Sequence, residues 1–134
     1  MAQHKSLVTK VKRFVEVEPG LKLALIYGSF AHDIATEKSD LDLAIALDHP
    51  LNAEERIDIS QRLSSLINRE VDLVDLNTSH GLILEESLCK GQWLVKRDPE
   101  LYASLLRRVW FDRSDFFPLR QRIFDQRRKS FEQK

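Results

Sequence analysis

The sequence predicts a mixed α/β (α+β) domain in which a small sheet is flanked by helices. Short apolar runs of strand length alternate with longer segments whose apolar residues recur every three or four positions, as in amphipathic helices. The chain has 134 residues, of which 43% are hydrophobic and 31% charged. This length and composition suit one globular domain and exclude the disordered and fibrous classes.

Each expected element has a local signal. Pro19-Gly20 ends the first helix, Asn52 followed by Glu55 is typical of a capping box, and Gly91 is a helix stop. The expected elements are helix 3–16, strands 21–27 and 41–47, helix 52–68, strand 71–76, a helix from Thr78 or Ser79 to about Leu88, strand 92–96, a helix from Asp98-Pro99 and, beyond a kink near Pro118, helix 119–131.

Helix periodicity also predicts which side chains are buried. We expect the helix over 52–68 to direct Ile59, Leu63, Leu66 and Ile67 inward, and we expect Cys89 to be a buried, inert thiol. The helix that begins at Asp98 is expected to bury Leu101, Leu105, Leu106 and Val109.

Several protein classes are excluded at this stage. The single cysteine, Cys89, cannot form an internal disulfide or a cysteine-based zinc site. No segment approaches the ~18 apolar residues of a membrane span, and the first ten residues lack the apolar run of a secretion signal. We therefore expect a cytoplasmic chain with no membrane partner.

The charges balance overall but are unevenly placed. The chain has 21 basic and 21 acidic residues, and residues 107–134 hold nine of the basic and four of the acidic ones, together with five phenylalanines. A segment rich in both arginine and aromatic residues is typical of a protein interface, although a solvated helix face would give the same pattern. We divide the chain into a domain over 1–98 and a helical extension over 99–134, which is expected to dock a partner.

The most informative segment is a Gly-Ser turn followed by two spaced acids. Gly28-Ser29 ends an expected strand, and Asp40 and Asp42 open the next one. Asp40 and Asp42 point to the same face of a strand, where two carboxylates repel unless a cation lies between them. Mg²⁺ is commonly held by one or two carboxylates plus substrate phosphates.

A third acid is expected from the following strand, where Asp72 and Asp75 are both candidates. Because they are three positions apart, they point to opposite faces. Two metal ions bridged by such acids can stabilise both the attacking and the leaving oxygen in phosphoryl transfer. The backbone of Gly28 and the hydroxyl of Ser29 could cradle a phosphate, with a further contact from Ser39. Tyr27 is expected to pack rather than to take part in the chemistry.

The motif Gly28-Ser29 through Asp40-Leu41-Asp42 resembles the G-S-x10-D-x-D motif of the nucleotidyltransferase fold shared with DNA polymerase beta. The short length and the strand that begins at Val71-Asp72 are similar to the minimal nucleotidyltransferase (MNT) branch, and in particular to MntA-type antitoxins, which are encoded beside a HEPN-domain ribonuclease toxin. The specific motifs cover about residues 20–96.

This resemblance implies an ATP- and Mg²⁺-dependent enzyme that transfers AMP to a tyrosine of a HEPN toxin, releases pyrophosphate and thereby blocks the toxin. It implies that Gly28, Ser29 and Ser39 hold the nucleotide phosphates. By the same resemblance Asp40, Asp42 and Asp72 are the catalytic and metal-binding acids. The resemblance also implies two Mg²⁺ ions, and no direct contact with nucleic acid is expected. Two alternatives stay open: an antitoxin that acts only by binding and occlusion, and a nucleotidyltransferase that modifies a small molecule such as an aminoglycoside.

One departure from the family pattern concerns the residue after Gly28-Ser29. Many members have arginine at this position, where this chain has Phe30. One possible phosphate contact is therefore absent.

Overall fold

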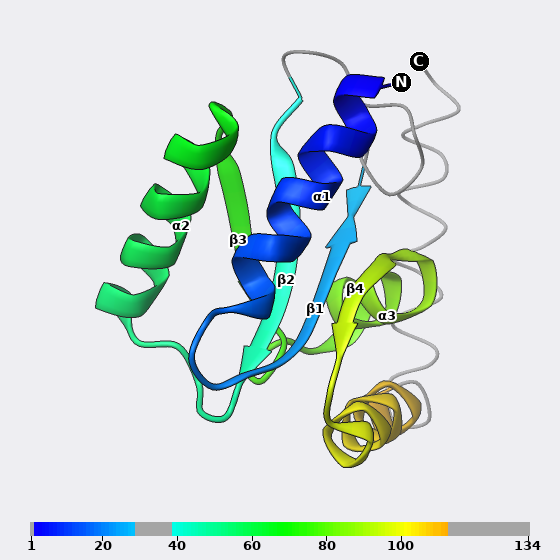
Figure 1. Cartoon of the computed structure of the whole chain (residues 1–134). Helices are drawn as coiled ribbons and strands as arrows, with labels where there is room; N and C mark the ends of the chain where they lie inside the picture. Colours follow the sequence, from blue (N-terminus) through cyan, green and yellow to red (C-terminus); the bar gives the residue numbers. More distant parts are fainter. Residues whose placement is uncertain (1, 29–38, 113–134) are drawn as a thin grey trace, which may run out of the picture.

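The structure, a computed structural model, describes residues 2–28 and 39–112. Its elements are α1 (Ala2–Glu16), β1 (Leu21–Tyr27), β2 (Leu41–Leu47), α2 (Ala53–Ile67), β3 (Val71–Asp75), α3 (Gly81–Lys90) and β4 (Gln92–Lys96). A final helix covers residues 99–112 and is called the 99–112 helix below. The mixed α/β class predicted from the sequence is confirmed (Figure 1).

The four strands form one mixed sheet in the order β3-β2-β1-β4. β1 pairs antiparallel with both β2 and β4, whereas β2 and β3 are parallel. The end of β1 therefore lies at the same edge of the sheet as the beginnings of β2 and β3. The Gly-Ser turn follows β1, and the acids open β2 and β3, so this topology brings the motif's described residues together.

Each face of the sheet is covered by two helices, as the alternation of side chains along the strands requires (Figure 1). One core packs Leu43 and Ile45 of β2 against α1 and α2, for example against Val11 and Leu63. The other core contains small β2 residues, such as Ala44, with α3 and the 99–112 helix. The 99–112 helix thus belongs to the second core, where Leu105 and Val109 are buried.

Several boundary signals act as expected. Asn52 and Glu55 form the predicted capping box: the Glu55 amide donates to the Asn52 side chain at 2.8 Å, and the Asn52 amide donates to Glu55 at 3.1 Å. Asn68 ends α2 in the left-handed conformation, with φ of 56°. The Leu101 amide donates to Asp98 Oδ1 at 3.0 Å, which caps the 99–112 helix. The helix expected over 119–131 lies outside the described residues.

Three local predictions are wrong. The helix after β3 begins at Gly81, not at a cap by Thr78 or Ser79, because both hydroxyls donate instead to the backbone oxygen of Asp75. Leu66 is 47% exposed because it lies at the margin of the apolar stripe of α2. Cys89 is exposed because it lies roughly 100° beyond the buried Leu88 around the helix axis.

None of the helices in the described part of the chain combines the length and the apolar character needed to cross a membrane.

Candidate active site

Three neighbouring strands place polar side chains side by side at one edge of the sheet. Tyr27, the last residue of β1, is the register partner of Asp42 on β2, and Asp42 is in turn the partner of Asp72 on β3. Directly paired residues on neighbouring strands project to the same face. The three side chains therefore form a row across the sheet, on the face that α3 covers.

Asp42 is the most perturbed group of this row. Burial, the nearby charges of Asp72 and Asp40, and a hydrogen bond with Asp72 raise the pKa of its carboxyl from 3.8 to about 6. Repulsion between crowded carboxylates is the situation that the sequence predicted for Asp40 and Asp42. The strongest single neighbour, however, is Asp72 on the adjacent strand rather than Asp40 on the same one.

Gly28 lies against Asp42 and leaves no room for a side chain. Its φ is +72°, a conformation that residues with a Cβ rarely adopt. A Cβ at this position would collide with Oδ2 of Asp42 and lie 3.2 Å from its Cγ. The backbone at the end of β1 can therefore approach the carboxylate row as closely as it does only because residue 28 is glycine. Ser29, the second residue of the motif, lies outside the described residues.

Ser39 and Asp40 enter the site from the segment before β2. The Arg69 guanidinium donates to the backbone oxygen of Ser39 at 3.0 Å, and the Leu41 amide donates to the oxygen of Glu70 at 2.9 Å. Together these bonds fix the start of β2 to the loop before β3. The role of Arg69 could not be predicted from the sequence, since a hydrogen bond between residues 30 positions apart has no local signal.

Asp75, the other candidate for the third acid, points away from the row. It is 2% exposed, and its oxygens accept hydrogen bonds from the amides of Leu51 at 2.8 Å and Asn77 at 3.0 Å. Its carboxylate therefore holds the turn after β3 and the segment before α2. Of the two acids in β3, the structure brings only Asp72 together with Asp42.

Tyr27 both packs and faces the acids. Its half-buried ring contacts the core on the α3 side of the sheet, which agrees with the expected packing role. Burial and the charges of Asp72 and Asp42 raise the pKa of its hydroxyl well above the ordinary value. Tyr27 is therefore a neutral phenol beside the carboxylate pair. Its place was implicit in the sequence, because a residue directly before Gly28 must lie at the edge where the acids begin.

The donor chemistry of the site suits a hard divalent cation. Asp42 and Asp72 supply carboxylate oxygens, which Mg²⁺ prefers, and the repulsion that raises the pKa of Asp42 is what a bound cation would relieve. Within residues 2–28 and 39–112, no group of three His, Cys, Asp or Glu side chains is arranged to hold a metal ion. The exposed Asp40 is close enough to influence Asp42, and it would have to turn inward to complete a set of three ligands.

Comparison with known proteins agrees with this geometry. The family model for the polymerase beta nucleotidyltransferases matches residues 9–100, which include both strands that carry the acids. The chain belongs to this family. The match ends shortly after β4 and so covers the whole sheet.

Relatives and solved structures point the same way. The protein adenylyltransferase MntA of Shewanella oneidensis is 30% identical over 87 residues, which are 63% of this chain and 63% of that protein. A crystal structure of a toxin–antitoxin with AMP-PNP superposes with a TM-score of 0.74 at 22% identity, covering 89% of this chain and 96% of that one. The structure of a tri-AMPylated Shewanella oneidensis HEPN toxin in complex with an MNT antitoxin gives a TM-score of 0.70 at 21% identity, covering 90% and 98%. At these identities the structural likeness shows the fold.

Proposed function

We propose that this chain is an antitoxin adenylyltransferase that transfers AMP from ATP to a tyrosine hydroxyl of a HEPN-domain ribonuclease toxin and thereby neutralises it. The observation that carries the proposal is the Asp42–Asp72 carboxylate pair, held beside a glycine that no other residue could replace without a collision. Family membership supports nucleotidyl transfer, and the matched MntA of Shewanella oneidensis supports a protein as the acceptor. The reaction belongs in the cytoplasm, where ATP is available.

The proposed acids are Asp40, Asp42 and Asp72, which would hold Mg²⁺, in the two-ion form that phosphoryl-transfer sites use. When bound, the metal neutralises the charge of the triphosphate. Asp72 is preferred to Asp75 as the third acid, since the oxygens of Asp75 are already engaged by two backbone amides.

The reaction exchanges one bond to the α-phosphorus for another. The tyrosine oxygen of the acceptor forms a bond to the α-phosphorus of ATP, the bond from that phosphorus to the β-bridging oxygen breaks, and pyrophosphate leaves. Asp72 is more exposed than Asp42 and would accept the tyrosine proton. Positioning and charge neutralisation carry most of the catalysis in reactions of this class.

The phosphates would be held by Gly28, Ser29 and Ser39. The close approach of the backbone at Gly28 supports this part of the proposal, because phosphate cradles are built from backbone amides that no side chain screens. Residues 1–98 would then form the catalytic domain, and 99–134 the extension that docks the partner.

One observation favours the alternative of neutralisation by binding alone. Trp110 and Phe111, at the end of the 99–112 helix, are 69% and 65% exposed. Exposed aromatic side chains are typical anchors of protein interfaces. Binding and transfer are compatible, since an enzyme that modifies a protein must also dock it.

Intact-protein mass spectrometry tests the proposal. The chain is incubated with ATP, Mg²⁺ and the HEPN-domain protein encoded beside it, and compared with its Asp42→Asn and Asp58→Asn variants. We expect an adenylate-sized mass increase on the partner with the wild type and with Asp58→Asn, whose side chain is exposed on α2. Asp42→Asn should lose at least about 10³-fold in rate. A stable complex without any mass increase would replace transfer by neutralisation through binding.

A further inference from the structure

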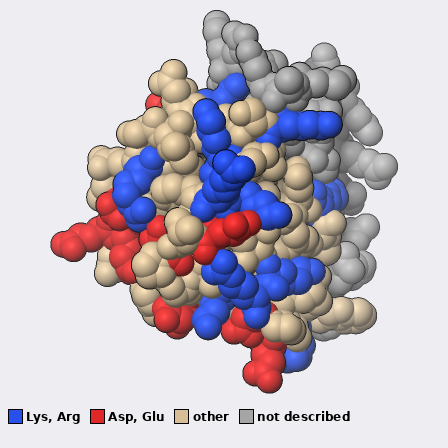
Figure 2. All heavy atoms as spheres, viewed as in Figure 1, with Lys and Arg blue, Asp and Glu red and all other residues tan. Residues whose placement is uncertain are grey.

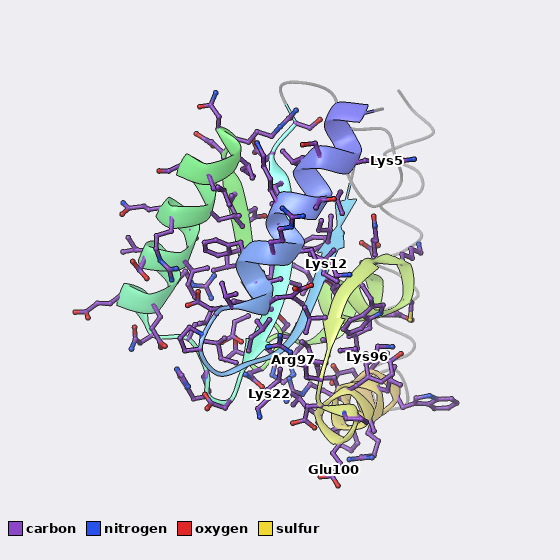
Figure 3. The ribbon with its side chains drawn as sticks, viewed as in Figure 1. Lys5, Lys12, Lys22, Lys96, Arg97 and Glu100 are labelled. Carbon is purple, nitrogen blue, oxygen red and sulfur yellow. The ribbon has the colours of Figure 1, made fainter. Side chains whose placement is uncertain are left out.

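A group of basic side chains covers the face of the molecule that α1 and β4 present. Figure 2 shows many lysine and arginine side chains on this face, in an upper and a lower group with acidic side chains between them and toward the lower and left margins. Figure 3 identifies the basic residues and shows that they extend outward from α1 and from the one end of the sheet where β1 begins and β4 ends. We call this group the basic face; it consists of Lys5, Lys12, Lys22, Lys96 and Arg97.

The five side chains form a band along α1 and one end of the β1–β4 pair, and Glu16 lies in this band beside Lys12. Lys5 and Lys12 are seven residues apart on α1, which is about two helical turns, so they lie on the same side of the helix. The Arg97 guanidinium donates to the backbone oxygen of Glu16 at 2.8 Å and so joins the end of α1 to the end of β4. The Arg97 amide donates to the oxygen of Lys22 at 2.9 Å, which places Lys22 directly beside it.

Two cations of the basic face are fixed in place rather than free to move. The Lys96 ammonium lies 4.6 Å from the ring centre of Trp93 and 4.1 Å from that of Tyr102. These two rings pack edge to face at 5.3 Å, so they form a rigid support for the charge. Arg97 is held by its hydrogen bond to Glu16. Charges that are already ordered lose little entropy when a partner binds.

Most of this charge has no acidic partner. In the described part of the chain, the only carboxylate within 4.0 Å of a basic nitrogen of this face is that of Glu16, beside Lys12. Such a band of mostly unpaired cations, two of them held in place, attracts an anionic partner over about 10 Å at moderate salt. This band is therefore suited to steering a binding partner rather than to stabilising the fold.

The chemistry of the face favours an acidic protein over a nucleic acid. The whole chain has no net charge and an isoelectric point near 6.9, whereas nucleic-acid-binding domains typically exceed about 9. Glu16 lies beside Lys12, Glu100 lies at the lower margin of the face (Figure 3), and both would repel a continuous phosphate backbone. A protein surface can match such a mixed pattern residue by residue, which gives specificity as well as attraction.

The Lys5 end of the basic face lies at the end of the sheet where the carboxylate row lies, whereas Lys22, Lys96 and Arg97 lie at the opposite end. Figure 1 shows the N-terminal part of α1 at the same end of the sheet as the end of β1 and the start of β2. We infer that the basic face docks an acidic surface of the acceptor protein, with the Lys5 end of the face nearest to the Asp42 end of the sheet. In naming the partner, this inference rests on the proposed function.

The test compares association rates of single charge reversals on one helix. Lys12→Glu lies on the basic face, and Lys10→Glu is its matched control, because Lys10 is exposed on the opposite flank of α1 and undergoes the same change of charge. Binding to the purified HEPN-domain partner is followed by biolayer interferometry at several salt concentrations. We expect Lys12→Glu to lower the association rate about 3-fold and Lys5→Glu with Lys12→Glu about 10-fold, with a weaker salt dependence.

The opposite change sharpens the test. Glu100→Lys adds a cation to the face and should raise the association rate about 3-fold. Lys10→Glu should stay within 2-fold of the wild type. In AMP transfer to the partner, Lys12→Glu should raise KM and leave kcat unchanged, because it acts on encounter and not on the reacting groups. Circular dichroism checks that each variant is folded.

Three results would overturn the inference. The first is equal association rates for Lys12→Glu and Lys10→Glu. The second is an unchanged salt dependence in the double variant. The third is tight binding of a fluorescein-labelled single-stranded RNA to the wild type, lost in Lys12→Glu while partner binding is unchanged. That result would assign the face to nucleic acid. Absence of AMP transfer with normal, charge-dependent partner binding would instead contradict the proposed function and leave the basic face supported.

Discussion

The carboxylates at the two ends of the central sheet have opposite environments. At one end, Asp42 and Asp72 face each other across neighbouring strands, and crowding raises the pKa of Asp42 to about 6. At the other end, the oxygens of the buried Asp75 accept two backbone amide hydrogen bonds. Nearby, His49 lies between Asp48 at 2.6 Å and Glu55 at 2.7 Å.

Within the short strand β3, one acid is proposed to take part in the chemistry and the other stabilises the fold. Asp72 and Asp75 belong to the same five residues of β3, yet Asp72 shares a hydrogen bond with the Asp42 carboxyl, whereas Asp75 accepts hydrogen bonds from two backbone amides. Buried polar groups are normally satisfied by hydrogen bonds, and crowded carboxylates without such partners are typical of sites that bind a cation or a substrate. The contrast predicts that substitutions at the two ends affect different properties.

Gly28→Ala at the crowded end is expected to reduce both AMP transfer and stability. The added Cβ meets the Asp42 carboxylate at a φ of +72°, so both the strain and the collision act on the site itself. We expect AMP transfer to fall at least about 100-fold and the free energy of unfolding to fall by about 2 kcal/mol. Steady-state transfer assays and urea denaturation measure the two effects.

A matched glycine substitution shows whether the loss at Gly28 is specific to the site. Gly81→Ala also introduces a Cβ at positive φ, but into open space. It should weaken stability by about 1 kcal/mol and leave transfer within a few-fold of the wild type. Equal losses of transfer in the two variants would contradict the assigned role of Gly28.

At the satisfied end, Asp75→Ala should act on stability. It leaves the amides of Leu51 and Asn77 without their acceptor, and we expect the free energy of unfolding to fall by about 2–4 kcal/mol. Asp72→Ala, three residues earlier in the sequence, removes an exposed carboxylate and should change stability by less than about 0.5 kcal/mol. Urea denaturation of both variants measures the difference. A larger loss of stability in Asp72→Ala than in Asp75→Ala would contradict the assigned roles of the two ends.

A smaller effect, dependent on pH, is expected from Asp42→Asn. The pKa of Asp42 is higher in the folded chain than its ordinary value of 3.8, so the folded state binds this proton more tightly. The wild type therefore loses stability as the pH rises from about 4 through 6, and the asparagine variant does not. Without divalent cations, Asp42→Asn should melt about 2–4 °C above the wild type at pH 7.5 and at the same temperature at pH 4.

Divalent cations should reverse this order. Mg²⁺ with a non-hydrolysable ATP analogue should raise the melting temperature of the wild type more than that of Asp42→Asn, since binding to the folded state stabilises it. Differential scanning fluorimetry across pH measures both conditions. A melting difference that is independent of pH would show that the charge of Asp42 carries no penalty in the folded chain.

Much of this contrast could be predicted from the sequence. The strand limits predicted at 21–27 and 41–47 agree with the structure. Each strand is a mostly apolar run that a turn residue, Gly28 or Asp48, ends, so its limits are easy to place. The capping box at Asn52 could also be predicted, because its two residues are only three positions apart in the sequence. The pairing of Asp42 with Asp72 required one additional step, the assumption that the two strands lie next to each other.

What the sequence left open depended on contacts between distant residues. The proposed preference for Asp72 over Asp75 rests on the amides of Leu51 and Asn77 that Asp75 accepts, of which Leu51 lies 24 positions away. Thr78 and Ser79 are residue types that often cap helices, but their hydroxyls donate to the backbone oxygen of Asp75 instead. The basic face combines residues from α1, β1 and β4, so no single window of the sequence contains it.

The most direct test of the difference between the two ends is divalent metal binding by the two acids of β3. Mn²⁺ binding in the presence of a non-hydrolysable ATP analogue is measured by electron paramagnetic resonance for the wild type, Asp72→Asn and Asp75→Asn. We expect Asp72→Asn to weaken binding at least about 10-fold and Asp75→Asn to stay within about 2-fold of the wild type. Loss of binding in Asp75→Asn, with normal binding in Asp72→Asn, would contradict the assignment of the crowded end as the active site.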